Sequence, residues 1–179
     1  MDITALTPGT WNVDASHSTV AFTARHLMVT KVRGRFGSFS GAITVPEDRL
    51  QSSVVATVEA GSISTGDDQR DGHLQSADFL ATDEFPTIEL RSTSLRPDGG
   101  DFVLVADLTI KGVTRSVEFE LEFEGVATDP WGNTKAAFSA ETEINRKDFG
   151  LEWNVVLETG GVLVGEKVKI TLDIQAVKS

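Results

Sequence analysis

The sequence predicts an all-β fold, an elongated antiparallel barrel of eight or nine strands with one short helical insertion. The first observation is strict alternation of apolar and polar residues from Val117 to Glu124, which recurs from Lys167 to Ile174. One dry face and one wet face are typical of antiparallel strands. The second observation is turn-forming residues between such segments, and the third is that only one segment has a helical pattern.

Strand-like segments follow one another along the chain. They cover Thr10–Asp14, Thr19–Leu27, Val32–Val45, Val54–Ser62, Thr87–Arg96, Asp101–Lys111, Val113–Gly125, Lys135–Asn145 and Lys167–Ile174. Turns rich in Gly, Pro, Asn and Asp separate the later segments, at Pro97–Gly100, Lys111–Gly112, Asp129–Asn133 and Thr159–Gly161. Gly34, Gly37 and Gly41 lie in the longest segment, where glycine permits the bends of a barrel corner.

The helical segment interrupts the strands after Ser62. Asp67 is placed to cap a short helix that runs through Arg70, Leu74 and Ala77, and Pro86 closes the region. Without internal repeats or linkers, residues 1–179 are expected to form one domain, with its core at about 11–177.

Closure into a barrel removes exposed strand edges, which favours it over an open sheet. The segment Val113–Gly125 extends roughly 43 Å at about 3.3 Å per residue. Tilted by about 40°, it gives a barrel roughly 30 Å tall. A barrel of eight strands is either filled by its own side chains or holds one small ligand, and periodicity leaves both open.

Composition excludes several classes of protein. The chain has 16 Lys and Arg against 27 Asp and Glu, a net charge of −11, which disfavours nucleic-acid binding and docking on an anionic membrane surface. Cysteine is absent, so disulfides, thiolate metal sites and cysteine nucleophiles are impossible. Apolar runs are too short for stable membrane insertion. Because the first eleven residues do not resemble a signal peptide, we expect a cytoplasmic location for the chain as it stands.

Short motifs occur in a fixed order from about Trp11 to Ala176. They are Trp11–Ser18, Arg25–Val29, Val32–Phe36, Ser62–Gly66, Arg70–Leu74, Asp78–Leu80, Phe85–Pro86, Leu108–Thr114 and Ile144–Leu151. Together they resemble the YceI-like, polyisoprenoid-binding family. The resemblance implies an elongated, eight-stranded, lipocalin-like barrel whose interior takes a long isoprenoid or similar lipid chain. It also implies bacterial relatives, frequent homodimers, and a periplasmic or extracellular location in many members.

Metal and catalytic motifs are weak. A zinc site could use His17, His26 and His73, but none of them has the spacing of a helical zinc motif. The segment Asp67–Gly72 imitates the start of a calcium loop, yet Asp78 stands where a bidentate glutamate is usual. Neither a nucleophile elbow nor a nucleotide-binding glycine motif occurs. We therefore predict no catalytic residue, metal or cofactor.

Apolar residues are the main candidate ligand contacts, although each could equally be part of a solid core. The residues predicted to line the interior are Val20, Phe22, Phe36, Leu108, Ile110, Phe119, Leu121, Ile144, Ile170 and Leu172. Those predicted for a mouth or lid are Phe79, Leu80, Phe85, Phe149 and Trp153.

Basic groups within the motifs could hold a phosphate, a pyrophosphate or a quinone oxygen at the mouth. The head-group candidates are His17, Arg25, His26 and Arg70. A structural alternative is an ion pair that fixes a loop, either Arg146 with Asp148 or Arg70 with Asp71. We favour the structural role for Arg146 and leave both roles open for Arg70.

Three functional hypotheses follow. The first is a non-enzymatic carrier that binds a polyisoprenoid, an isoprenoid quinone or a similar long-chain lipid inside the barrel. The second is an enzyme acting on such a lipid, which requires His17, His26 and Arg70 to converge on the cavity. The third is a filled barrel that acts through its outer surface, for example as a dimeric interaction protein.

Overall fold

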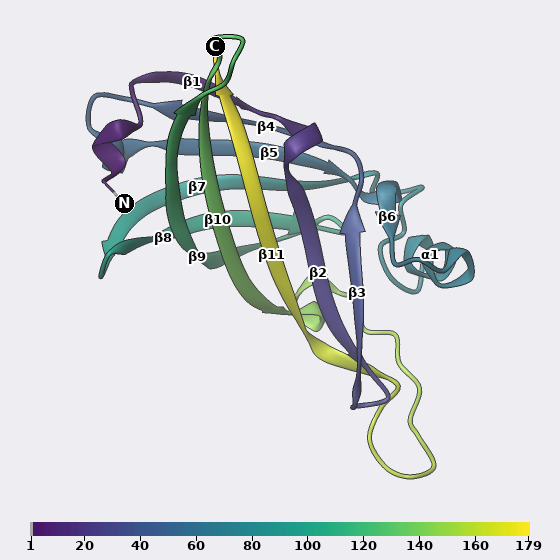
Figure 1. Cartoon of the computed structure of the whole chain (residues 1–179). Coiled ribbons are helices and arrows are strands. Elements are labelled where there is room, and N and C mark those ends of the chain that lie inside the picture. Colours follow the sequence, from purple (N-terminus) through teal and green to yellow (C-terminus); the bar gives the residue numbers. More distant parts are fainter. Residues whose placement is uncertain (1) are drawn as a thin grey trace.

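The computed structural model describes residues 2–179, in which eleven strands form one continuous antiparallel sheet (Figure 1). The strands are β1 (Gly9–Val13), β2 (Thr19–His26), β3 (Thr30–Phe36), β4 (Phe39–Val45), β5 (Ser53–Glu59), β6 (Ile63–Ser64), β7 (Thr87–Asp98), β8 (Asp101–Ile110), β9 (Val113–Thr128), β10 (Thr134–Asn145) and β11 (Val164–Lys178). The other elements are the helix α1 (Asp68–Gln75) and the 3-10 turns η1 (Ile3–Ala5), η2 (Ala15–His17), η3 (Arg49–Gln51), η4 (Ala60–Ser62) and η5 (Arg146–Phe149).

The sheet closes on itself through β11. Its C-terminal part pairs with β1, with Trp11 opposite Lys178, and its N-terminal part pairs with β2, with Phe22 opposite Ile170. Strands β1 and β2 are therefore two halves of one wall strand, interrupted by η2. The result is a closed, eight-stranded antiparallel barrel with one helix, which confirms the predicted fold class.

The long strand predicted over Val32–Val45 is two strands. The chain breaks at Gly37 and Ser38 because it changes partners there: β3 pairs with β2, whereas β4 pairs with β1 and β5. The next predicted strand, Val54–Ser62, likewise ends early in η4 before the short β6. Phe36 on β3 and both Phe39 and Ile43 on β4 line the cavity, so the inward face changes from even to odd positions and the alternation shifts by one residue at the break.

Strand β9 is longer than predicted. It passes through Gly125 instead of ending there, and the pairing shifts so that Gly125 faces Ala137 while Phe123 faces Phe138. Gly125 has φ 132°, a conformation that L side chains rarely adopt. The glycine therefore forms a β-bulge within the strand, and the true turn follows at Asp129.

Helix α1 begins as predicted and ends sooner. The Asp67 carboxylate accepts a hydrogen bond from the Arg70 amide (3.0 Å), the expected N-cap. The helix ends at Gln75 and not at Ala77, because the Ser76 amide closes a tight last turn on the His73 carbonyl (3.1 Å). Within residues 2–179, no helix has the length and apolar character needed to cross a membrane.

Two clusters of buried apolar residues occupy the two ends of the barrel. One contains Leu6, Trp11, Val45, Phe102, Phe123, Ala136 and Ala176. The other contains Ile63, Phe79, Leu80, Leu108, Ile110, Phe149 and Leu151. Strand β8 connects them, from Phe102 at one end to Ile110 at the other. A space lined by apolar side chains lies between the two clusters.

Candidate functional site

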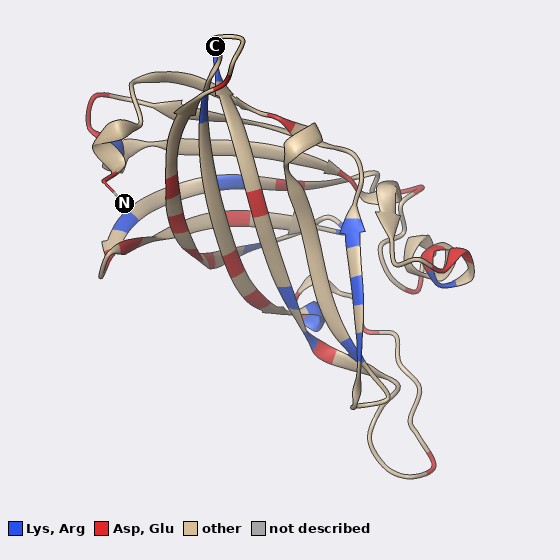
Figure 2. Cartoon of the chain, viewed as in Figure 1, with Lys and Arg blue, Asp and Glu red and all other residues tan. Residues whose placement is uncertain are grey.

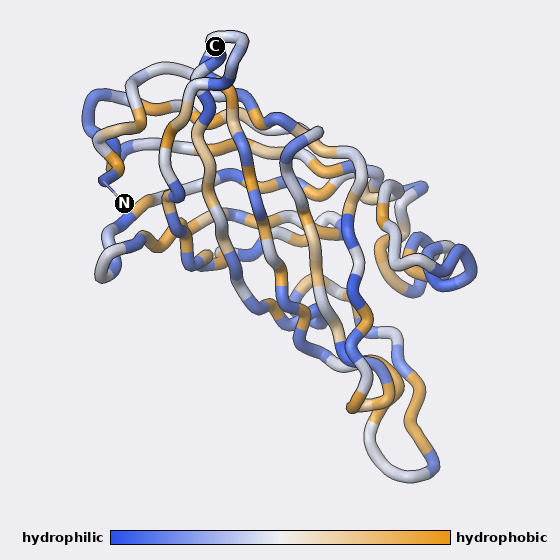
Figure 3. The backbone as a smooth tube through the Cα atoms, viewed as in Figure 1, coloured by the Kyte–Doolittle hydropathy of each residue, from blue (hydrophilic) through white to orange (hydrophobic). Residues whose placement is uncertain are grey.

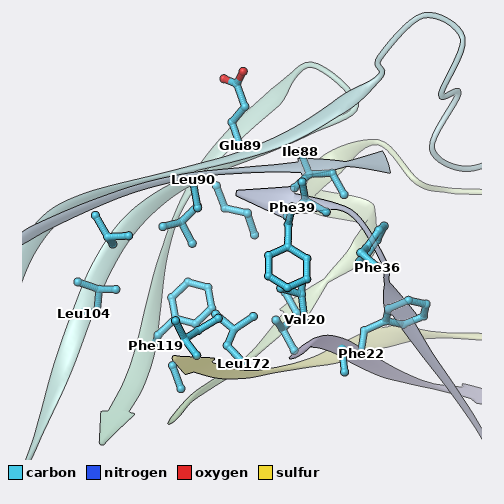
Figure 4. Close-up of a pocket in the computed structure, with 18 of the residues that line it drawn as sticks. Val20, Phe22, Phe36, Phe39, Ile88, Glu89, Leu90, Leu104, Phe119 and Leu172 are labelled. Atoms are coloured by element: carbon cyan, nitrogen blue, oxygen red, sulfur yellow. The ribbon is translucent and has the colours of Figure 1, made fainter. Parts of the chain in front are cut away.

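A cavity of about 320 Å³ lies inside the barrel, lined by the inward faces of the strands (Figure 4). This volume is at the lower end of the range for small-molecule sites. All ten residues that the alternation placed inside lie on its wall: Val20, Phe22, Phe36, Leu108, Ile110, Phe119, Leu121, Ile144, Ile170 and Leu172. Nearly the whole wall is hydrocarbon.

Alternation along each strand produces this wall. On β9, Phe119 and Leu121 face the cavity, whereas Glu118 and Glu120 are exposed on the outer surface. Figure 4 shows Phe119 in the cavity and the carboxylate of Glu89 pointing away from it. The cavity side therefore carries almost no charge, although the protein as a whole is strongly acidic.

Further residues line the cavity that were not among the predicted ones, although the same alternation of apolar and polar residues includes them. They include Phe39, Val58, Ile88, Leu90, Leu104, Phe123, Phe138, Val168 and Ile174. Phe123, for example, is two residues after Leu121 and so shares its inward face. Alternation therefore predicts the inward facing of these side chains as well.

The residues predicted for a mouth or lid divide into two groups. Phe79, Leu80 and Phe149 are buried and line the cavity. Phe85 packs instead against Gly112 in the β8–β9 turn, where an added Cβ would be 2.7 Å from the Phe85 ring. Trp153 does not line the cavity and packs against His73 and Phe79.

Trp153 joins an aromatic cluster that holds α1 against the segment following η5. The His73 ring lies edge-on to Trp153 with centroids 4.5 Å apart, and Phe79 is 5.4 Å from Trp153. The His73 Nε2 also lies 2.9 Å from an Asp78 carboxylate oxygen. These contacts pack α1 and the segment after η5 together behind the cavity wall.

His17 and Arg25 lie outside the barrel. His17 is exposed on η2, with Nδ1 2.8 Å from an Asp14 carboxylate oxygen and 3.0 Å from the Ser16 hydroxyl. Hydrogen bonds from Ser16 and His17 lower the pKa of Asp14 to about 2. Arg25 is exposed on β2, opposite Lys31.

His26 and Arg70 also lie off the cavity wall. His26 ends β2 opposite Thr30 and Val164. Arg70 donates from Nε to the Thr65 hydroxyl (2.7 Å) and from Nη2 to the Thr65 carbonyl (2.9 Å). Asp71 accepts from Thr65 as well, so Thr65 connects the two side chains, and the direct ion pair that was one of the two open roles for Arg70 does not form within residues 2–179. The four head-group candidates do not converge in this structure.

Arg146 is the one charged residue buried among residues 2–179, with 4 % exposure, and it lies on the cavity wall. Its Nη1 donates to the carbonyls of Leu151 (2.6 Å) and Trp153 (3.0 Å). Its Nε and Nη2 donate to the carbonyls of Gly165 (2.8 Å) and Val164 (3.3 Å). Arg146 therefore fixes the two ends of the segment between η5 and β11.

The partners of Arg146 differ from the prediction. Carbonyl groups take the place of the expected Asp148 carboxylate, so the guanidinium is hydrogen-bonded without a direct counter-ion. Burial lowers the pKa of Arg146, and the nearby charge of Glu166 opposes that shift. Because nearly all the guanidinium donors are engaged, the role of Arg146 in this structure is to position a loop.

Acidic and histidine side chains do not gather into a metal-binding group of three or more anywhere in residues 2–179. In the segment that imitates a calcium loop, Asp67 caps α1 and Asp71 binds Thr65. Both carboxylates thus take part in local hydrogen bonds.

Comparison with known proteins finds a matching family model and similar relatives. A family model described as a YceI-like domain matches residues 11–176. UPF0312 protein SAB2563 of Staphylococcus aureus is 40 % identical over 158 residues, covering 87 % of this chain and 90 % of the relative.

Solved structures share the fold at lower identity. BcnA of Burkholderia cenocepacia has a TM-score of 0.77 and 22 % identity, covering 91 % of this chain and 98 % of that one. A polyisoprenoid binding domain from Saccharophagus degradans has a TM-score of 0.73 and 16 % identity, covering 94 % and 98 %.

Proposed function

Because this chain belongs to the YceI-like family, we propose that it binds and carries a long-chain lipid inside its barrel without chemically changing it. A polyisoprenoid or an isoprenoid quinone is the favoured ligand class. The similarity of fold to the polyisoprenoid binding domain from Saccharophagus degradans supports this choice.

The cavity is the observation that carries the proposal. Its wall is made of aliphatic and aromatic side chains from strands all around the barrel, and it lies between the two apolar clusters. Burial of hydrocarbon in such a space stabilises a complex by about 25 cal/mol per Å². A ligand with a long apolar chain gains most from this wall, and a compact polar metabolite gains little.

The alternatives have less support. An enzyme would need His17, His26 and Arg70 to meet at the cavity, and all three lie off its wall. A completely filled barrel would leave no internal volume, whereas this barrel encloses about 320 Å³. Lipid binding is the hypothesis that uses the internal space.

The decisive experiment is native mass spectrometry of freshly purified protein, followed by organic extraction and identification of any released mass. We expect a reproducible long-chain lipid, or uptake of an added prenyl lipid by the lipid-free protein. Protein that is empty and also fails to take up prenyl lipids would overturn the proposal.

A pair of alanine substitutions separates cavity binding from attachment elsewhere. Ala140 lines the cavity, so Ala140→Phe fills the space that a lipid chain would occupy and should reduce uptake at least tenfold. Ala127 is exposed near the end of β9, and Ala127→Phe is the matched control that should leave uptake unchanged. Equal uptake by two folded variants would place the ligand outside the barrel.

A further inference from the structure

The β2–β3 hairpin is basic, although the protein is acidic. From Ala15 to Pro46 the sequence contains no Asp or Glu, and its Lys and Arg residues are Arg25, Lys31, Arg33 and Arg35. All four are exposed, and the register places Arg25 opposite Lys31 on the outer face. Figure 2 shows this blue stretch along β3, while red segments mark β9 and β10.

These hairpin cations have no partners. Among residues 2–179, no side-chain hydrogen bond or ion pair engages Arg25, Lys31, Arg33 or Arg35. Two cations of β11 differ: Lys169 lies 2.9 Å from Glu141, and Lys167 lies 3.5 Å from Glu143. The positive charge of the hairpin is therefore available to an external anion.

An exposed apolar patch lies at the tip of the same hairpin. Met28 and Val29 are 57 % and 75 % exposed, and Val156, in the segment between η5 and β11, is 80 % exposed. The Leu27 amide donates to the Leu163 carbonyl (2.8 Å), which joins the two segments. Figures 1 and 3 show the β2–β3 hairpin and the segment between η5 and β11 extending beyond the barrel. In Figure 3 both carry orange, hydrophobic stretches.

This end of the molecule is also an end of the cavity. The cavity wall includes Ala24 and Val164, and Val164 lies opposite His26 in the sheet. The exposed tip begins at the next residue, Leu27. A ligand leaving the cavity at this end would therefore emerge beside the apolar tip.

We propose that this end, formed by residues 25–35 and 155–163, docks on the surface of an anionic lipid bilayer. The apolar tip enters the head-group region, and the four cations contact lipid phosphates, an arrangement typical of peripheral membrane proteins. The proposal identifies the partner from which the cavity is loaded, and in that respect it rests on the proposed function. The net charge of −11 does not oppose it, because charges beyond about 10 Å are screened at ordinary salt.

A bilayer fits better than a second copy of the chain. The acidic groove on the barrel wall, lined by residues such as Glu120, Glu141 and Asp173, could accept the hairpin cations of another copy. That groove is lined mainly by charged and hydroxyl side chains, so it would leave Met28 and Val29 exposed to water. A head-group region receives both the cations and the apolar tip.

Vesicle flotation of the full chain tests the proposal. We compare vesicles of phosphatidylcholine alone with vesicles in which about one third of the lipid is phosphatidylglycerol. We expect binding to the anionic vesicles only, lost between about 0.1 M and 1 M salt. The double variant Lys31→Gln/Arg33→Gln should bind roughly 25-fold more weakly, at roughly fivefold per cation. Val29→Ser should weaken binding up to roughly tenfold.

Matched controls come from elsewhere on the barrel. Arg91→Gln removes an exposed cation of β7 that also has no partner among residues 2–179, and it should bind like the wild type. Trp131→Ser removes an 84 % exposed aromatic residue at the β9–β10 turn, and it should also have no effect. Equal weakening by Arg91→Gln and the hairpin variant would overturn the proposal, as would salt-sensitive self-association without vesicle binding.

Uptake of a fluorescent prenyl lipid from vesicle-free solution separates this proposal from the proposed function. Hairpin variants that keep uptake but lose flotation would support docking. Wild-type protein that takes up the lipid but never floats with anionic vesicles would overturn docking and leave the cavity function intact. Flotation without any uptake would support docking and remove the cavity function.

Discussion

The ring of Phe22 lies directly on Gly34, its cross-strand neighbour on β3. A Cβ added at Gly34 would collide with the ring and would also lie 3.0 Å from a methyl carbon of Thr65. The glycine therefore leaves room for an aromatic side chain on the cavity wall. Phe22 in turn packs against Phe36, with ring centroids 5.8 Å apart.

Gly34→Ala should push the Phe22 ring toward the cavity. We expect a loss of about 1–3 kcal/mol in the free energy of unfolding, together with weaker lipid uptake, because the displaced ring occupies ligand space. Urea unfolding and lipid titration measure the two effects. Gly37→Ala is the matched control, since its Cβ would meet nothing closer than 3.9 Å. Indistinguishable behaviour of the two variants would contradict the role assigned to Gly34.

Arg146→Met should destabilise the fold. The substitution leaves the buried carbonyl of Leu151 and the partly buried carbonyl of Gly165 without their donor, and we expect a loss of about 2–4 kcal/mol. Urea unfolding and the rate of proteolysis within residues 151–163 report the effect. The control Arg96→Met breaks an exposed pair with Glu118 and should change stability by about 0.5 kcal/mol or less. Similar values for both variants would contradict the loop-positioning role.

Asp14→Asn should weaken a pH-dependent contribution to stability. The pKa of Asp14 is about 2 in the folded protein, below its usual value of 3.8, because the ionised carboxylate accepts hydrogen bonds from Ser16 and His17. A depressed pKa stabilises the fold above about pH 4, and the contribution disappears as the pH falls through about 2.

The wild type should therefore be more stable than Asp14→Asn by about 1 kcal/mol at neutral pH, with the difference shrinking below about pH 4. Unfolding curves at several pH values test this expectation. Asp83→Asn is the control, since no hydrogen bond or ion pair of its carboxylate occurs in the part of the chain that the structure describes. A difference that stays constant with pH would contradict the assignment.

Affinity should rise with ligand chain length. Each methylene moved from water to the cavity adds about 0.8 kcal/mol, or roughly fourfold in the dissociation constant. Displacement of a fluorescent lipid by prenyl alcohols of increasing length measures the slope. The slope should fall once the chain exceeds the cavity of about 320 Å³. Affinity that is independent of length from the shortest alcohol onward would place the binding energy in the head group.

Much of the fold and the cavity wall could be predicted from the sequence. Alternating residues such as Phe119 and Glu120 fix which side of a strand is dry, because successive side chains point to opposite faces. Closure of the sheet turns every dry face toward one interior. The ten predicted lining residues consequently lie on one wall, although their positions along the chain run from Val20 to Leu172.

The polar candidates could not be placed in the same way. Whether Arg70 meets Asp71 or Thr65 depends on how α1 folds back on β6, and whether Arg146 meets a carboxylate or carbonyls depends on the course of residues 151–165. Long side chains reach partners that are distant in sequence or held by loops. No local pattern determines those partners.

The sequence by itself determined the family, the antiparallel barrel and the apolar character of its interior, because these follow from residue order and period-two alternation. The tertiary structure alone decided which strands β3 and β4 pair with, the carbonyl cage of Arg146 and the distribution of charge. Net charge is a sum over the chain, whereas electrostatic attraction at ordinary salt acts over about 10 Å. Only folding shows that the unpaired cations of an acidic protein lie beside an apolar tip.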